Sequence, residues 1–584
     1  MELLNSIHNG AQLTLDKKEE LNSINIFPVA DADTGTNISS LMQALLDFRI
    51  SNNSTIKEVL VGISDASILG SRGNSGLIFS QFLNGLSEGF NELKEDETSF
   101  IKASSIAAKK ARESLIDPKE GTIISVMDAW TNSLNIASSK NSFESSLIIA
   151  EKACKIEVDN TKIKNKLLKK NNIVDSGALA FYYFINGFTS SYLNKKVKLN
   201  SNLEIFPESM VNNDVSFQTK EPEKRYCSEF IVAPEQNNLD LLKERLSYFG
   251  DSIVIGAMSS DRIKIHIHTN TPSLVLESLV KCGKIKYQKV DDMLLQYMIS
   301  NNDESEIAVV TDSIADLPSD FLLQKKVSVL PMNISLDGDQ FLDKITTNSD
   351  YFYTKLDIAS GNTSQPSIPS IDSLFSYLEG KYKHVIVITV SSQLSGTYQL
   401  VKQRIKEKGY DSSWIQVIDS KLNSVAQGLI VQNAVQIISE GCPFKETIRE
   451  IESSIERTFI YVSINDLSYM IKSGRIPTRL GKWAKKLSLF PVISLNKKGN
   501  GVLKGIYFTR LMSIKAVMKK INKMEVRKEI ESLGIAYTTK SDGVKSILSK
   551  INSEKVSYSV ISSASILINA GKGSIAIAGI KRRK

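Results

Sequence analysis

Apolar residues in the first 195 positions recur at the three- and four-residue spacing of amphipathic helices. The first such run has its apolar positions at Ile38, Leu41, Met42 and Leu45. Similar runs cover residues 55–69, 101–115 and 121–137, and short turns of Gly, Ser and Asp separate them. No run alternates in the manner of a half-buried strand. The pattern predicts an all-helical domain over residues 1–195.

The pattern changes after residue 195. Residues 196–224 are polar and contain Asn, Ser, Glu and Pro, a composition typical of a linker. Between residues 225 and 300, the segments SEFIVA, SIVIGAM and RIKIHIHT are predicted to be strands. A helix is expected at about residues 238–249, between the first two strands. We therefore expect a small α/β middle domain over residues 225–300.

A third pattern covers residues 301–584, where short β-rich runs alternate with amphipathic helices. The runs are EIAVVTDS, VSVLPMNI, HVIVITVSS, WIQVIDS, RTFIYVS, LGIAYTT and VSYSVISS. This alternation predicts an α/β fold with a mostly parallel sheet. Many of the runs end in Ser, Thr or Asp, and sites in such folds form at the carboxyl ends of the strands.

Composition narrows the class of protein. The net charge of +8 is small for 584 residues, and the basic residues are dispersed except for the final KRRK. This distribution argues against a nucleic-acid partner. No apolar run reaches the ~18–20 residues needed to cross a bilayer, and the start of the chain does not resemble a signal peptide. Four dispersed cysteines suit a reducing compartment. We expect a cytoplasmic protein that could also lie at the membrane periphery.

The stretch NIFPVADADTGTNISSLM contains the first candidate site. Asp31 and Asp33 stand two residues apart, just before a predicted helix. Two carboxylates so close repel each other unless a cation lies between them, and carboxylate oxygens suit Mg²⁺. A phosphate could bind the amides at the helix start. The alternative is a plain turn with a helix cap, because Asp, Thr, Gly and Asn are common in both.

Three further turns rich in small residues lie in the helical region. They are GSRGNSG (70–76), PKEGT (118–122) and VDSGA (174–178). Glycines allow backbone amides to approach a phosphate closely, although each segment alone could be a simple helix–helix turn. Four such turns in one domain suggest one shared nucleotide site.

Together the four segments resemble the DhaL-type kinase domain, in order and in approximate spacing. The resemblance implies an antiparallel helical barrel that binds ATP and Mg²⁺ at one end. Asp31 and Asp33 match its catalytic metal ligands, and Asn25 matches a third ligand. The matching nucleotide-side positions are Thr36, Asn37, Gly73, Asn74, Ser75, Gly76, Thr122 and Asp175. Ala30 and Ala32 depart from the family pattern, which has Pro and Gly there.

The middle domain carries a second candidate site. Two of the four histidines, His266 and His268, stand two apart in KIHIHTN and so face the same side of a strand. With a thiolate such as Cys227 they could bind Zn²⁺, which favours such ligands. The alternative is a pair of ordinary strand histidines. The pattern YCSEF…HIHTN also resembles the middle domain of bacterial fatty acid kinases, which implies a zinc site at these three residues.

The third candidate site lies in residues 301–584. The ordered set VVTDSIADLP, NTSQPS, SSQLSGTY, VIDSKLNSVAQG and YMIKSGRI resembles the DegV family. The resemblance implies a two-lobed α/β domain that binds a long-chain fatty acid. Thr363, Ser395 and, as an alternative, Ser392 match carboxylate-binding positions, and Arg475 matches the family arginine. Asn569 stands where the family usually has a histidine, and Lys572 where it has a proline, so that no histidine can titrate there.

The combination predicts a fatty acid kinase fused to its lipid-binding protein, which forms an acyl phosphate. Two alternatives stay open: a kinase for a dihydroxyacetone-like small molecule, and a non-catalytic lipid-binding or regulatory protein. Analogy with DhaL-type kinases suggests a homodimer. The family further suggests a membrane acyltransferase as the acceptor of the product.

Overall fold

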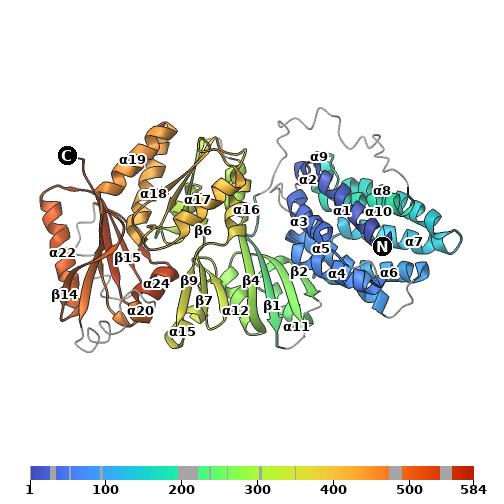
Figure 1. Ribbon diagram of the computed structural model, residues 1–584, viewed down its shortest axis with the longest axis horizontal. Coiled ribbons are helices and arrows are strands. Elements are labelled where there is room, and N and C mark those ends of the chain that lie inside the picture. Colours follow the sequence, from blue (N-terminus) through green and yellow to red (C-terminus); the bar gives the residue numbers. More distant parts are fainter. Residues whose placement is uncertain are drawn as a thin grey trace. The chain divides into compact units, whose positions relative to one another are not determined.

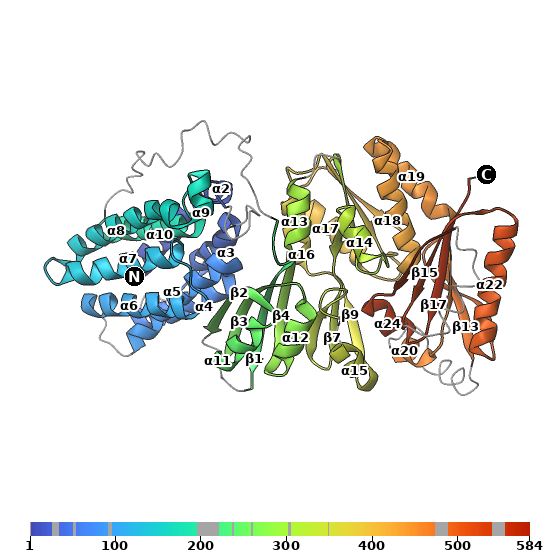
Figure 2. The same ribbon diagram turned by 180° about the vertical axis from the view of Figure 1, so that it is seen from behind.

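The computed structural model describes residues 2–25, 34–50, 54–91, 96–194, 221–235, 239–258, 261–301, 305–348, 350–472, 489–539 and 555–583. The chain divides into two compact units, Met1–Tyr297 and Met298–Lys584. The helical region and the middle domain, which the sequence predicts as separate domains, therefore share one compact unit (Figures 1 and 2).

Helices form the first part of the first unit, as predicted, and the described residues of 2–194 contain no strand. They are α1 (Glu2–Asp16), α2 (Lys18–Ser23), α3 (Thr34–Asp47), α4 (Ile56–Gly70), α5 (Gly73–Asn91), α6 (Glu97–Glu113), α7 (Ile123–Ser138), α8 (Phe143–Lys164), α9 (Lys166–Asn171) and α10 (Ser176–Tyr192). Helix α10 is buried along most of its length and packs against α1, α7 and α8. Its rings join an aromatic cluster around Phe181, Phe79, Phe82 and Trp130.

The middle domain is a four-stranded antiparallel sheet with strand order β2-β3-β1-β4. Its elements are β1 (Tyr226–Pro234), α11 (Leu239–Ser247), β2 (Gly250–Met258), β3 (Arg262–Thr269), α12 (Pro272–Val280), β4 (Gly283–Asp292) and α13 (Met293–Ser300). The three strands and the helix α11 predicted from the sequence are present. Strand β4 was not predicted, because its residues are mostly polar and half-buried.

The sheet docks onto the helices mainly through β2. The amide of Ile255 donates to the carbonyl of Ser114 at 2.9 Å, so that the segment after α6 extends the edge of the sheet. A Cβ atom at Gly256 would lie 2.5 Å from Nε2 of Gln81 and 2.9 Å from the side chain of Leu77, so β2 lies close against α5 at this glycine. Val254 belongs to the same buried core as the helices. The sheet thus reaches the core of the helical region through this residue.

The described residues of the second unit form three sheets rather than one. A parallel sheet, β11-β10-β5-β6, matches the prediction. The expectation of a mostly parallel sheet is wrong for the six-stranded sheet β14-β13-β12-β17-β15-β16, in which only β15 and β16 run parallel. A small antiparallel sheet, β8-β7-β9, completes the unit. The run VSVLPMNI is also two strands, because the chain leaves the parallel sheet at Pro331.

The strands of this unit are β5 (Ile307–Asp312), β6 (Ser328–Leu330), β7 (Asn333–Leu336), β8 (Asp339–Leu342), β9 (Gly361–Ser364), β10 (His384–Thr389), β11 (Ile415–Asp419), β12 (Thr458–Ser463), β13 (Phe490–Leu495), β14 (Gly501–Tyr507), β15 (Ile530–Tyr537), β16 (Val556–Ile561) and β17 (Ile575–Lys581). Its helices are α14 (Ser319–Gln324), α15 (Asp350–Ile358), α16 (Ile368–Leu378), α17 (Thr397–Lys408), α18 (Ser424–Ser439), α19 (Phe444–Arg457), α20 (Leu467–Lys472), α22 (Arg510–Val526) and α24 (Ala564–Ala570).

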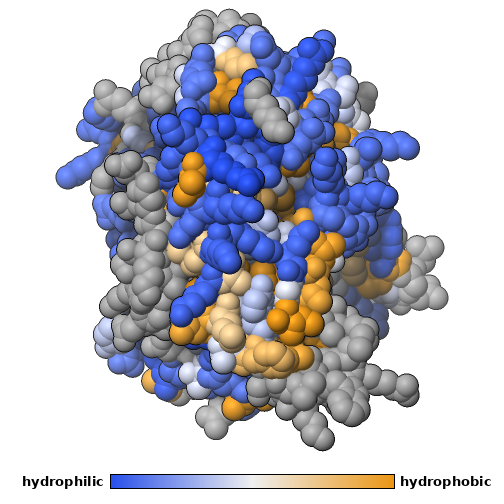
Figure 3. Space-filling view, turned by 90° about the vertical axis from the view of Figure 1, so that its left-hand side faces the viewer, coloured by the Kyte–Doolittle hydropathy of each residue, from blue (hydrophilic) through white to orange (hydrophobic). Residues whose placement is uncertain are grey.

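Helix α18 joins the two larger sheets. Its apolar residues Val425 and Leu429 belong to one buried cluster with Ile386 of the parallel sheet and Ala578 of the six-stranded sheet. One side of this unit carries exposed apolar side chains on β14, at the start of α22 and in the connection between them, namely Leu503, Ile506, Phe508, Leu511 and Met512. Figure 3 shows this side of the chain. Among the described residues, no helix is both long and apolar enough to cross a membrane.

Buried aspartates hold helix α24 in place. Asp343 accepts the amide of Ala564 at 2.9 Å and the hydroxyl of Ser313 at 2.8 Å. Asp316 accepts the amide of Ser563 at 2.8 Å and lies 3.5 Å from the ammonium group of Lys344. Burial raises the pKa of both carboxyl groups, although Lys344 and the hydrogen bonds oppose the shift. The helix that carries Asn569 is therefore positioned by residues that follow β5 and β8.

We expect Asp343→Ala to destabilise this unit by about 1–3 kcal/mol, because it leaves buried donors at Ala564 and Ser313 without an acceptor. Hydrogen exchange measured by mass spectrometry should show faster exchange in α24. The control Asp320→Ala removes an exposed carboxylate and should leave the exchange of α24 unchanged. Unchanged protection of α24 in Asp343→Ala would contradict the role assigned to this carboxylate.

Candidate functional site

The segment GSRGNSG forms the turn between α4 and α5. Helix α4 ends at Gly70, and α5 begins at Gly73, so Gly73–Gly76 form the first helical turn rather than a loop. Gly73 has a φ of +62°, and a Cβ atom there would lie 2.8 Å from Nδ2 of Asn37. Both the backbone conformation and the close approach favour glycine. The turn is thus packed directly against a predicted nucleotide-side residue of α3.

The segment VDSGA forms the start of α10 and packs against the same turn. The Asp175 carboxylate caps the helix by accepting the amide of Ala178 at 2.8 Å. Burial raises the pKa of Asp175 to about 6, although backbone hydrogen bonds oppose the shift. A Cβ atom at Gly177 would lie 2.7 Å from Oγ of Ser75. The starts of α5 and α10 therefore lie against each other.

The segment PKEGT leads into α7. The hydroxyl of Thr122 donates to the carbonyl of Lys119 at 2.7 Å, and the amide of Gly121 donates to Ser125 at 2.9 Å. Gly121 has a φ of +76°, which favours glycine in this turn. These contacts hold the turn at the start of the helix.

The three helix starts and the middle sheet line one open cavity of about 590 Å³. Four predicted nucleotide-side residues line it: Asn74, Ser75, Thr122 and Asp175. The middle domain contributes other lining residues, among them Asp251, Ser252 and His268. Oδ1 of Asn74 is buried and has no hydrogen-bond partner among the described residues, which is the state expected of an acceptor that meets a ligand.

The other predicted residues of this site have different positions. Thr36 donates its amide to Oδ1 of Asn22 at 3.0 Å. Thr36, Asn37, Gly73 and Gly76 do not line the cavity, although Asn37 and Gly73 support its wall. Asn25 is buried. Asp31 and Asp33 lie outside the described residues, so their role as metal ligands stays a prediction.

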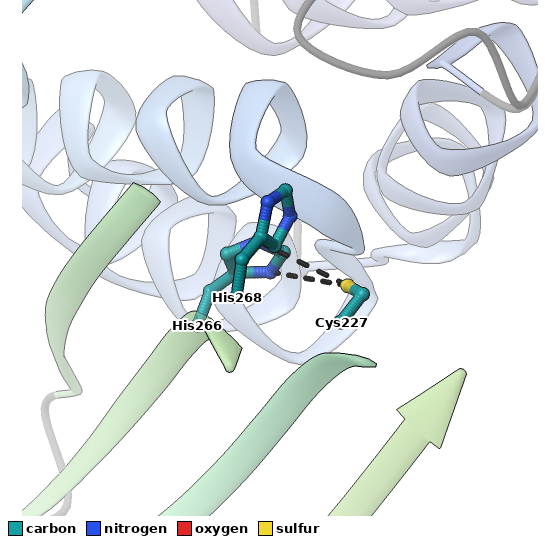
Figure 4. A group of neighbouring side chains, drawn as sticks. All are labelled: Cys227, His266 and His268. Carbon is teal, nitrogen blue, oxygen red and sulfur yellow. Dashed lines mark hydrogen bonds between the residues drawn. The ribbon is translucent and has the colours of Figure 1, made fainter. Parts of the chain in front are cut away.

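The structure brings Cys227, His266 and His268 together, as predicted (Figure 4). Cys227 on β1 pairs directly with His268 on β3, so the side chains share one face of the sheet. The thiol sulfur lies 3.9 Å from the His266 ring nitrogens, and one candidate ligand atom from each residue lies within 4.8 Å of the others. Burial, followed by the neighbouring His266, lowers the pKa of His268 to about 3. A neutral imidazole of this kind can bind a metal.

Two charged residues on this sheet face were missed in the sequence. Glu229 and Lys264 are both almost fully buried, and their charged atoms lie 3.6 Å apart. Burial would raise the pKa of Glu229, but Lys264 and other neighbouring groups outweigh it and hold that pKa below its ordinary value. Burial lowers the pKa of Lys264 to about 8, and Glu229 opposes this shift. The sequence did carry a signal for both residues. Glu229 stands two residues after Cys227, and Lys264 stands two residues before His266, so each lies on the same strand face as the candidate metal ligands.

In the second unit, the predicted carboxylate-binding residues lie on several segments. Thr363 is on β9, Ser392 and Ser395 lie between β10 and α17, and Asn569 is on α24. A Cβ atom at Gly361 of β9 would lie 2.9 Å from the side chain of Ile568 on α24, so these two elements meet. Arg475 lies outside the described residues.

An apolar cluster lies beside these segments. It consists of Ile314, Met332 and Val390, with Leu394 and Ile566 packed against it. Ile314, Met332 and Val390 follow strands of the parallel sheet at their carboxyl ends, whereas Leu394 lies next to Ser395, and Ile566 belongs to the helix of Asn569. The side-chain amide of Asn569 donates through Nδ2 to the backbone carbonyl of Ser565 at 2.8 Å, within its own helix.

Comparison with known proteins agrees with the three resemblances. Residues 28–190 match the model of the DAK2 domain, and residues 223–299 match the model of the FakA-like middle domain of fatty acid kinase. Residues 306–582 match the model described as an uncharacterised protein of the DegV family. Kinase-type domains thus precede a DegV domain in one chain.

Individual relatives cover different parts of the chain. A DegV domain-containing protein of Clostridium acetobutylicum is 30% identical over 229 residues, which are 39% of this chain and 77% of that protein. An uncharacterised protein of Mycoplasma genitalium is 27% identical over 333 residues, and the match spans 53% of this chain and 59% of that protein. The structure of a fatty acid binding DegV family protein from Streptococcus agalactiae is 26% identical, covers 48% of this chain and all of that chain, and has a TM-score of 0.43.

The match to the Clostridium acetobutylicum protein and the DegV model together settle the family. The chain belongs to the DegV family through residues 306–582, and it carries a DAK2 domain and a FakA-like middle domain ahead of that region.

Proposed function

We propose that this protein is a fatty acid kinase in which the kinase and the lipid-binding protein form one polypeptide. One observation carries the proposal. Asn74, Ser75, Thr122 and Asp175 come from three separate motifs, yet they line one cavity of about 590 Å³. A cavity of this size is within the range of small-molecule sites. The match of residues 223–299 to a fatty acid kinase middle domain supports the choice of substrate.

The nucleotide would be ATP. The starts of α5, α7 and α10 contribute residues to the cavity, and helix N-termini favour bound phosphates. Asp31 and Asp33, with Asn25, would hold Mg²⁺, which supplies charge neutralisation for the phosphate groups. The side chains of the chain itself bind and orient the nucleotide, which is most of what phosphoryl transfer requires of a protein.

The acceptor would be the carboxylate of a long-chain fatty acid bound by the DegV domain. Its oxygen attacks the γ-phosphorus of ATP, the bond from that phosphorus to the bridging oxygen breaks, and ADP leaves with the electron pair. A carboxylate is already ionised near neutral pH, so the reaction needs no general base. Thr363, Ser395 or Ser392, Asn569 and Arg475 would bind the carboxylate, and the cluster around Ile314 and Val390 would contact the acyl chain.

Cys227, His266 and His268 would hold Zn²⁺. A thiolate and two neutral imidazoles are ligands that zinc favours, and three protein ligands leave one position open. His268 also lines the cavity, so this site lies at the wall of the proposed nucleotide site.

The first test is the reaction itself. Purified protein with Mg²⁺, ATP and oleate should form acyl phosphate, which hydroxylamine traps as a hydroxamate. Asp31→Asn and Asp33→Asn should each lower the rate by at least about 100-fold, because the charge of the phosphates is then poorly neutralised. Asp47→Asn, an exposed carboxylate of α3, is the control. Product from dihydroxyacetone instead of oleate would favour the small-molecule kinase.

The metal site is tested by elemental analysis. Wild-type protein should contain about one zinc per chain, and Cys227→Ser should lose most of it, because the thiolate is the softest of the three ligands. Cys282→Ser is a matched control, since this half-buried cysteine lies outside the cluster. Equal zinc contents in the two variants would exclude Cys227 as a ligand.

Lipid binding is tested by extraction and mass spectrometry. The purified protein should carry a long-chain fatty acid, and Thr363→Val and Ser395→Ala should each weaken oleate binding about 5- to 30-fold, as expected for a lost hydrogen bond to a charged group. Ser412→Ala, in an exposed turn, is the control. Tight lipid binding without any hydroxamate would favour the non-catalytic lipid-binding protein.

A further inference from the structure

The charged face of the middle sheet is buried against the turn between α4 and α5. Glu229 of β1 and Lys264 of β3 have side-chain exposures of 5% and 1%, respectively. Both reach residues of the helical domain that are distant in sequence: Lys264 contacts Ser71, and Glu229 contacts Gly73. This is the turn that precedes Asn74 and Ser75, which line the cavity.

Lys264 acts at the end of α4. Its ammonium group donates to the carbonyl oxygen of Ser71 and lies 3.1 Å from the hydroxyl oxygen of the same residue. Ser71 is the C-cap residue of α4, so its carbonyl has no acceptor role within the helix. A cation is favourable at this end of a helix because the macrodipole is negative there.

Glu229 acts at the start of α5. Its Oε1 accepts the amide of Gly73 at 2.7 Å. An anion is favourable at this end because the macrodipole is positive there. One ion pair therefore meets two helix ends of opposite polarity, and its two charges lie on the correct sides. The pair contacts both limbs of the turn, where the Arg72 guanidinium also donates to the Ser71 carbonyl at 2.8 Å.

If its only role were to stabilise the fold, this buried ion pair would be costly. Removing two charges from water often costs more than their attraction returns, and apolar replacements of buried ion pairs are frequently neutral or stabilising. The pair instead provides directional hydrogen bonds, because Lys264 is a donor to Ser71 and Glu229 is an acceptor for Gly73. Gly73, with its positive φ, has little conformational restraint of its own and depends on such contacts.

We propose that Glu229 and Lys264 are positioning residues of the nucleotide site, through which the middle domain holds the Ser71–Gly73 turn and aims Asn74 and Ser75 into the cavity. This inference rests on the proposed function, because it assigns ATP to that cavity. It makes the middle domain part of the nucleotide site rather than a connector between the kinase and lipid-binding parts.

The test measures MgATP affinity of the full-length protein by calorimetry. Lys264→Met keeps the length of the side chain but removes the donor to Ser71 and the ammonium group that lies 3.6 Å from Glu229, and we expect the Kd for MgATP to rise at least tenfold. Oleate affinity and zinc content should stay at the wild-type values. Lys286→Met is the control: Lys286 is an exposed lysine of β4. Its Kd for MgATP should change less than threefold.

A conservative double variant separates positioning from folding. Glu229→Gln with Lys264→Gln retains an acceptor for Gly73 and a donor for Ser71 without any buried charge. We expect it to recover MgATP affinity to within about threefold of wild type, and hydrogen exchange in the first turn of α5 should be slower than in Lys264→Met.

The outcomes are distinguishable. Wild-type affinity for MgATP in a folded Lys264→Met variant would overturn the positioning role and leave the proposed kinase intact. A loss of affinity equal in Lys264→Met and Lys286→Met would also overturn it, because the effect would then belong to the sheet as a whole. Absence of MgATP binding in the wild-type protein would overturn the proposed function as well.

Discussion

The docking of the middle sheet on the helical bundle is the constraint on which the first unit depends. The contact has an apolar part, where β2 lies against α5 at Gly256, and a charged part, where Glu229 and Lys264 meet the turn between α4 and α5. The apolar part supplies the free energy of association. The charged part is directional and sets the register, because each charge meets only one suitable helix end. Without the sheet, the cavity would lose the wall that contains Ser252 and His268.

Buried charge has a similar positioning role in the second unit. Asp316 and Asp343 meet the amides at the start of α24, and their desolvation is offset by these amides, by serine hydroxyls and by Lys344. In both units, a costly buried group connects segments that are far apart in the sequence. Each buried group also lies beside a candidate ligand site. Such groups specify geometry more than they add stability.

The helices of residues 1–195 and the strands of the middle domain could be predicted because their apolar spacing is local and regular. The six-stranded sheet could not, since β13, β14 and β17 lie outside the runs that the sequence predicts as strands. The grouping of Cys227 with His266 and His268 was predicted from spacing and resemblance, and the structure brings the three side chains together. The contact between Glu229 and Gly73 could not be predicted, because it depends on how two regions 156 positions apart dock.

The identity of residue 569 bears on how the second unit could serve a kinase. A histidine at this position could carry charge and exchange a proton with a bound carboxylic acid. Asn569 can only donate or accept hydrogen bonds, and its amide already donates to Ser565. The carboxylate would then keep its own charge, stabilised by hydroxyl donors such as Thr363 and Ser395. An ionised carboxylate is the nucleophile that phosphoryl transfer to a fatty acid requires. Asparagine at this position is therefore compatible with the proposed catalysis, and it would remove one source of pH dependence from the proposed binding of a fatty acid.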